Sequence, residues 1–161
     1  MVKQQKIFNW NHISDELTEE QIKELKAYYY TYHKKCWAYK QAAKRFKKWN
    51  LLGNTLSIIF ASGGFASSIA TGGISLIAIS TAALLIQSWM KHKELDLKIQ
   101  NCIYAYQSYQ HLLNRIKNMM RSGNFNSSHI YNTMKNLDDY VTDNSPVVDK
   151  YFIKYDEKFT Y

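Results

Sequence analysis

The chain has 161 residues and a formal net charge of +8, so it can build one domain with a core. The charge favours anionic partners, such as a lipid surface or a nucleic acid. Its two cysteines, Cys36 and Cys102, do not suggest a disulfide framework, and a single proline permits very long helices. The first residues lack the apolar stretch of a secretory signal, so we expect the N-terminus to start in the cytosol.

A long helix is predicted to follow an N-terminal extension, residues 1–17. Thr18 can cap its free backbone amides while Gln21 reaches back to the capping residue. Residues 18–48 then form a basic, tyrosine-rich helix. Its apolar side chains recur at alternating steps of three and four, at Ile22, Leu25, Tyr29, Tyr32, Cys36, Tyr39, Ala43 and Phe46. This spacing predicts one face that packs against a partner helix.

An uncharged stretch follows, because no ionisable residue lies between Lys48 and Lys91. We predict an apolar helical hairpin over residues 49–90, with its turn at the sequence TGG, residues 71–73. Each arm nearly spans a hydrocarbon layer of ~30 Å at ~1.5 Å per residue.

Antiparallel pairing about that turn makes two internal predictions. It brings Trp49 close to Trp89. It also brings together Asn54 and Gln87, the most polar side chains of the two arms. A hairpin explains both coincidences together.

A second stalk helix is predicted over residues 91–122, with the same alternation of apolar positions. These are Leu95, Ile99, Cys102, Tyr106, Tyr109, Leu113, Ile116 and Met120. Gly123 is available as its C-cap. Residues 123–161 hold a short amphipathic helix, lined by Ile130, Met134, Leu137 and Val141, and a tail that the pattern does not assign.

The length of the arms and the tryptophans and cations at their edges favour a membrane hairpin over the core of a soluble bundle. Small residues let helices approach closely in lipid, and four of them predict such contacts in the first arm: Gly63, Gly64, Ser67 and Ser68. The same residues make this arm a poor lipid-facing helix. The alternative is therefore a soluble helical hairpin whose small residues are buried in an oligomer.

Aromatic and basic side chains border both arms at one end, as at a membrane interface. The predicted interfacial anchors are Trp49, Trp89, Lys47, Lys48, Lys91 and Lys93, and the predicted anionic-surface residues are Lys40, Lys44 and Arg45. The positive-inside rule then places both termini in the cytosol. Anionic headgroups are the preferred partner of these cations, ahead of DNA or RNA.

The sequence predicts no enzyme. No nucleophile and base stand at a productive spacing, and no glycine loop that could cradle a phosphate has a lysine nearby. His33 and Cys36 lie one helical turn apart, but a lone pair does not make a metal site. We therefore expect no catalytic, cofactor-binding or metal-binding residues.

The order of segments resembles known membrane proteins. A charged helix, LKAYYYTYHKKCWAYKQAAKRFKKWN, enters the hairpin and a second, KELDLKIQNCIYAYQSYQHLLNRIKNMM, leaves it. This resembles the SLATT group of two-transmembrane effector domains. It is also similar to small membrane proteins of invertebrate Maverick/Polinton-type mobile elements and related large DNA viruses. The resemblance covers residues 18–121 and implies paired membrane helices, cytosolic helical extensions and a pore-forming role.

Together these patterns predict an all-α protein: a long antiparallel helical hairpin with an apolar, transmembrane tip and a coiled-coil-like stalk, followed by a short C-terminal helix. The predicted function is a non-enzymatic membrane protein that forms a homo-oligomer and makes a pore or remodels a bilayer. One alternative is a structural protein of a virion or mobile element, membrane-associated or a soluble helical bundle. Another is a basic protein associated with nucleic acid.

Overall fold

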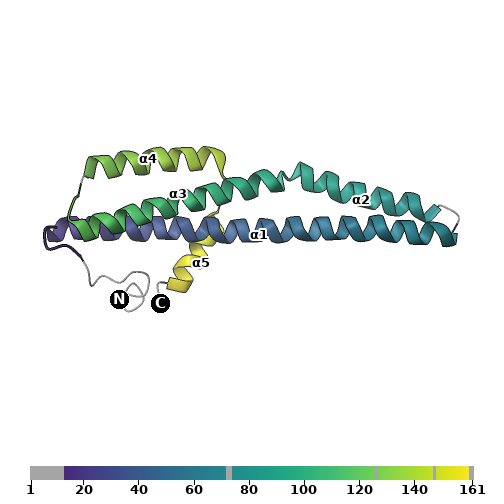
Figure 1. Cartoon of the computed structure of the whole chain (residues 1–161), viewed down its shortest axis with the longest axis horizontal. Helices are drawn as coiled ribbons and strands as arrows, with labels where there is room; N and C mark the ends of the chain where they lie inside the picture. Colours follow the sequence, from purple (N-terminus) through teal and green to yellow (C-terminus); the bar gives the residue numbers. More distant parts are fainter. Residues whose placement is uncertain (1–12, 72–73, 126, 147, 160–161) are drawn as a thin grey trace. The chain divides into compact units, whose positions relative to one another are not determined.

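The computed structural model describes residues 13–71, 74–125, 127–146 and 148–159. These residues form five α-helices and no strand, which confirms the all-α prediction (Figure 1). The helices are α1 (Glu19–Thr71), α2 (Ile74–His92), α3 (Leu95–Ser122), α4 (Ser127–Asn144) and α5 (Asp149–Phe159). The chain divides into two compact units. Residues 1–42 and 101–161 form the bundle unit, and residues 43–100 form the arm unit.

The predicted capping of the first helix is confirmed. The backbone N–H of Gln21 donates to Thr18 Oγ1 over 3.3 Å, and the N–H of Thr18 donates to Gln21 Oε1 over 2.9 Å. Glu19 and Glu20 occupy the first turn, where their charge suits the positive end of the helix dipole. From this start α1 continues without a break to Thr71, so residues 18–48 are not a separate helix.

The core of the bundle unit is formed by the two predicted apolar stripes and by α4 and α5. On α1 the stripe is buried at Leu25, Tyr29, Tyr32, Cys36 and Tyr39. On α3 the buried positions include Cys102, Tyr109, Leu113, Ile116 and Met120. Ile130, Met134 and Val141 of α4 close one side of this core, as the amphipathic pattern predicts.

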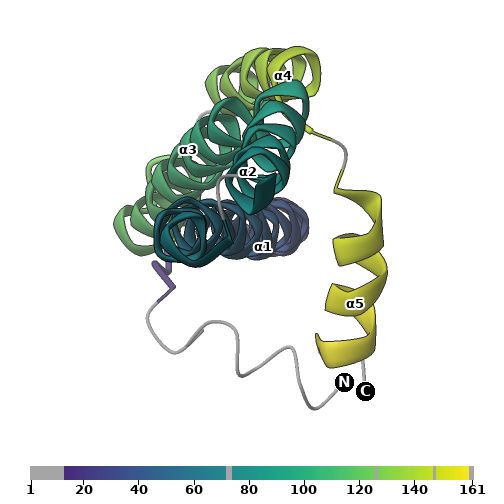
Figure 2. The same ribbon diagram turned by 90° about the vertical axis from the view of Figure 1, so that its right-hand side faces the viewer.

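The last helix, α5, has no counterpart in the sequence prediction, which left this tail unassigned. Tyr151 and Tyr155 lie one turn apart on one face of it and are both buried. The Tyr155 ring packs against Tyr30 and Trp37 of α1. Figure 2 shows α5 in yellow, apart from α4 and running across the direction of α1.

Gly123 ends α3 in the left-handed conformation, with φ of +72°, as its predicted C-cap role requires. Its N–H donates to the carbonyl of Met119 over 3.0 Å. A Cβ atom here would lie 2.5 Å from Glu16 Oε2 and 2.7 Å from Ser14 Oγ. Both the backbone conformation and the lack of space therefore demand glycine.

In the arm unit the second part of α1 and α2 contact each other at two places. The rings of Trp49 and Trp89 lie 6.5 Å apart, as predicted. A Cβ atom on the buried Gly53 would collide with the Met90 side chain, so the glycine leaves room for that side chain between the two helices. The predicted turn falls at residues 71–73, of which 72 and 73 lie outside the described residues.

The second stalk helix begins later than predicted, at Leu95, because the chain turns between α2 and α3. Glu94 adopts a φ of +50°, a left-handed conformation that a helix interior does not contain. Lys91 and Lys93, which were predicted to begin this helix, instead end α2 and form the turn.

The predicted membrane hairpin is wrong, and with it the pore-forming function and the membrane localisation. Within the described residues, no helix contains a stretch that is both long and apolar enough to span a bilayer. The prediction took an uncharged stretch for an apolar one. In α1 the leucines of this stretch are interrupted by the run Gly53, Asn54 and Thr55. The 19 residues of α2 include Gln87 and end in a lysine and a histidine.

Candidate functional site

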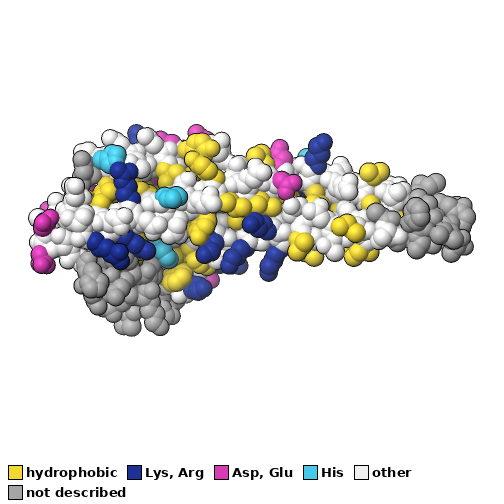
Figure 3. Space-filling view, viewed as in Figure 1, with side chains coloured by type: hydrophobic (Ala, Val, Ile, Leu, Met, Phe, Trp, Pro, Cys, Tyr) yellow, Lys and Arg dark blue, Asp and Glu magenta, His cyan; other side chains and the backbone are white. Residues whose placement is uncertain are grey.

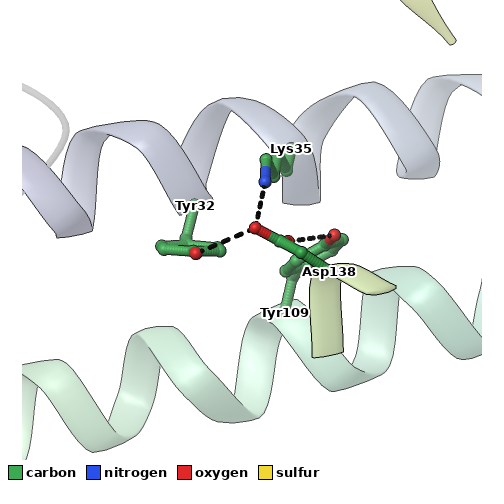
Figure 4. A network of polar contacts seen from close by, with 4 residues as sticks. All are labelled: Tyr32, Lys35, Tyr109 and Asp138. Carbon is green, nitrogen blue, oxygen red and sulfur yellow. Dashed lines mark hydrogen bonds and ion pairs between the residues drawn. The ribbon is translucent and has the colours of Figure 1, made fainter. Parts of the chain in front are cut away.

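The most concentrated polar cluster of the bundle unit surrounds Asp138 of α4 (Figure 4). Its carboxylate accepts hydrogen bonds from the hydroxyls of Tyr32, over 3.0 Å, and Tyr109, over 2.8 Å. It also forms an ion pair of 2.6 Å with Lys35 Nζ. Three helices, α1, α3 and α4, thus meet at one carboxylate.

The two tyrosines of this cluster keep their phenolic protons and so act as hydrogen-bond donors. Burial, followed by the negative charge of Asp138, raises the pKa of Tyr32 well above its ordinary value. Burial and the hydrogen bond to Asp138 raise the pKa of Tyr109 further. A phenol with a raised pKa is a poor nucleophile and a poor acid near neutral pH. The cluster therefore joins the three helices, and its two tyrosines stay protonated near neutral pH.

A second cluster holds α5 against α1. The hydroxyl of Tyr155 lies 2.7 Å from Nδ1 of His33, and Lys34 forms an ion pair of 2.5 Å with Asp156. Phe159 packs on the Tyr155 ring, with the ring centroids 4.4 Å apart. Burial, and then the positive charge of Lys117, lowers the pKa of His33.

We expect acidification to weaken this contact. Undocking of α5 returns His33 to its ordinary pKa of ~6.5, so the undocked chain takes up a proton first as the pH falls. The contribution of His33 to the stability of the docked state is therefore fully present above pH ~6.5. It decreases as the pH falls from there toward the lowered pKa of His33 in the folded chain. Melting temperatures of the parent chain should fall through this range, and His33→Gln should remove part of the fall. His111→Gln, an exposed position on α3, is the matched control. An unchanged pH profile in His33→Gln would contradict the assignment.

The two cysteines are unreactive by environment. Both are buried and free, and burial raises the pKa of each thiol to about 11. Among the described residues, no group of three or more His, Cys, Asp or Glu could hold a metal ion. His33 and Cys36 therefore have no further metal ligands beside them there.

The arm unit presents an unusual amount of apolar surface, here called the arm surface. Its large aliphatic side chains are between 45% and 67% exposed, and several are visible in yellow along the arms in Figure 3. The arm surface consists of Leu51, Leu52, Leu56, Ile58, Ile59, Leu84 and Leu85. Isolated exposed leucines are ordinary, but a cluster of this size on two adjacent helices is typical of an interaction site.

The predicted site residues fall into three groups. The side chains of Gly63, Gly64, Ser67 and Ser68 lie outside the described part of the structure. The predicted interfacial anchors Trp49, Trp89, Lys47, Lys48, Lys91 and Lys93 are all exposed in the arm unit, but the described helices offer no membrane span for them to anchor. Lys40, Lys44 and Arg45 are exposed on α1, with the Lys40 ammonium 5.4 Å from the Tyr106 ring in the bundle unit.

A pocket of about 500 Å³ lies at the open end of the arms. Asn54 and Gln87, which the predicted pairing brings to one level, both line it. Asn50 donates a hydrogen bond of 2.8 Å to Asp96 at its edge. The lining mixes amides, both signs of charge and apolar side chains, so it specifies no single ligand class.

Sequence reasoning missed Asp138 and Tyr155. Tyr151 and Tyr155, with Phe159, recur at steps of four, and this spacing could have predicted α5. Nothing comparable marks Asp138, because its three partners lie on other helices far away in the sequence.

No protein-family model matches this chain, and no curated protein or solved structure does. The resemblance to two-transmembrane effector domains and to mobile-element membrane proteins accordingly stays an expectation from the order of segments.

Proposed function

We propose that the chain is a non-enzymatic structural protein whose arm surface packs against the arm surface of a second copy. The observation that carries the proposal is the exposure of seven large aliphatic side chains on two adjacent helices. A helix with apolar residues on several sides normally lies buried among other helices. Burying one such leucine or isoleucine fully contributes ~1.5–3 kcal/mol.

A second copy is the partner that the charge pattern favours. The arms carry no ionisable residue between Lys48 and Lys91, so two copies can approach without repulsion over that whole length. A two-fold interface uses the same patch on both subunits and needs only a self-complementary surface. An uncharged apolar face meets this requirement without any matching pattern of charges.

We further infer that the arm unit is an antiparallel helical hairpin and that α1 and α3 pack as a coiled-coil-like stalk. The contacts of Trp49 with Trp89 and of Gly53 with Met90 support the hairpin. The burial of Tyr32, Cys36 and Tyr109 within the alternating stripes supports the stalk. In this arrangement two hairpins would form a four-helix contact between copies.

Sedimentation velocity of the full chain tests the proposal. The parent chain should sediment as an oligomer, and Ile58→Glu with Leu84→Glu should shift it to the monomer, because each charge would be buried without a partner. Ile153→Glu is the matched control, since Ile153 is 64% exposed in the bundle unit, close to the 67% of Ile58 and the 66% of Leu84. A monomeric parent chain, an oligomer that survives the double variant, or a control variant that dissociates as well would refute the proposal.

A further inference from the structure

Two tryptophans form an exposed aromatic platform in the arm unit. Trp49 of α1 and Trp89 of α2 are 46% and 45% exposed, although their rings lie 6.5 Å apart, edge to face at an interplanar angle of 65°, so each indole offers its own face to a base. Each indole therefore covers part of the other and keeps nearly half of its own surface in water. Exposed tryptophan is unusual unless a flat or apolar partner covers it.

Cations flank this platform on both helices. Arg45 lies one turn before Trp49 on the same face of α1. The N–H of Lys93 donates to the carbonyl of Trp89 over 2.9 Å, which continues the helical turn and puts Lys93 on the same side as Trp89. Both cations are exposed, and Figure 3 shows lysine and arginine side chains beside apolar ones near the start of the arms.

The charge of this region is largely uncompensated. Residues 43–100 contain seven lysines and arginines against Glu94 and Asp96. In the described part of this range, neither Arg45 nor Lys93 has a carboxylate within ion-pair distance, since both recorded ion pairs lie in the bundle unit. Asp96 is engaged by the amide of Asn50.

We propose that this platform binds single-stranded nucleic acid, with two bases stacked on Trp49 and Trp89 and the adjoining phosphates paired with Arg45 and Lys93. Stacking on indoles together with cations along the backbone is how proteins hold single strands without reading sequence. A duplex hides its base faces and would use the cations alone. Stacking and phosphate pairing do not involve the ribose 2′-hydroxyl, so RNA and DNA should bind alike.

The platform and the arm surface consist of different residues, so variants can test the two proposals separately. Fluorescence anisotropy of short labelled oligo(dT) and oligo(rU) with the full chain tests it. Trp49→Ala with Trp89→Ala should weaken binding at least tenfold, and Trp49→Phe with Trp89→Phe should restore part of the loss, because phenylalanine still stacks. Circular dichroism of each variant establishes that the helices are retained.

The charges are tested separately by salt dependence. Arg45→Gln with Lys93→Gln should weaken binding and reduce the slope of log affinity against log salt by about 1.4, because each lost phosphate contact removes ~0.7 for a single strand. Lys23→Gln with Lys154→Gln removes two exposed charges of the bundle unit and is the matched control, expected to change the affinity far less.

Three outcomes would overturn the proposal. Duplex DNA or heparin could bind as tightly as oligo(dT), with no effect of the tryptophan variants, which would indicate attraction to any polyanion. The chain could bind no oligonucleotide at low salt. It could also bind vesicles of phosphatidylserine and phosphatidylcholine through Trp49 and Trp89 while ignoring oligonucleotides, which would assign the platform to a lipid surface.

Discussion

Replacing Asp138 with alanine should destabilise the bundle unit by about 3 kcal/mol, because it removes the shared acceptor of two buried tyrosines and the partner of Lys35. Each hydrogen bond to a charged group contributes ~1.5–3 kcal/mol, but the carboxylate is 28% exposed, so water recovers part of the loss. In a chain of this size the melting temperature should fall by roughly 6–12 °C.

Two further variants separate charge from hydrogen bonding at this position. Asp138→Asn keeps an acceptor oxygen for one tyrosine but loses the charge that pairs with Lys35. Its melting temperature should therefore lie between that of Asp138→Ala and that of the parent chain. Asp139→Ala, at the exposed neighbouring position, should melt like the parent. If Asp138→Ala and Asp139→Ala melt alike, the cluster in Figure 4 does not join the three helices.

The second large effect is expected from Leu113→Asp. Leu113 is 1% exposed on α3, so an aspartate there would place an unpaired carboxylate in the core. Truncation to alanine alone costs ~2–5 kcal/mol at such a site, and burying a charge without a partner adds to that. We expect loss of the cooperative thermal transition measured by circular dichroism, with Leu113→Ala intermediate.

The exposed neighbour Asn114 provides the control for that experiment, since Asn114→Asp adds the same charge at the surface. A parent-like melting curve for Leu113→Asp would show that the stripe over α3 is not buried. Such a result would remove the basis of the bundle unit.

Much of the bundle unit could be predicted because its signals are local. The capping box of Thr18 and Gln21 and the left-handed Gly123 depend on residues three or four apart. The buried stripes follow from helical periodicity alone. Asp138 could not be predicted, because its importance comes from tertiary packing that brings Tyr32 and Tyr109 to it.

The arms were misjudged for a different physical reason. Absence of charge over residues 49–90 suggested a membrane, but hydrocarbon selects for apolar surface rather than for neutrality. Asn54 and Gln87, which line the pocket in the arm unit, carry polar amides. Polar amides make a helix less favourable in hydrocarbon. Leucines and isoleucines on the same helices still need a partner, and the sequence alone does not say which.

A distance between two copies is the most direct test of the proposed assembly. A nitroxide at Ile58→Cys, in a chain with Cys36 and Cys102 replaced by alanine, reports on the arm surface, and one at Ile153→Cys reports on the bundle unit. Double electron–electron resonance should show a defined dipolar coupling between copies at residue 58, which dilution with unlabelled chain removes. Absence of any coupling at residue 58, at every concentration where the chain remains in solution, would contradict packing of the arms against a second copy.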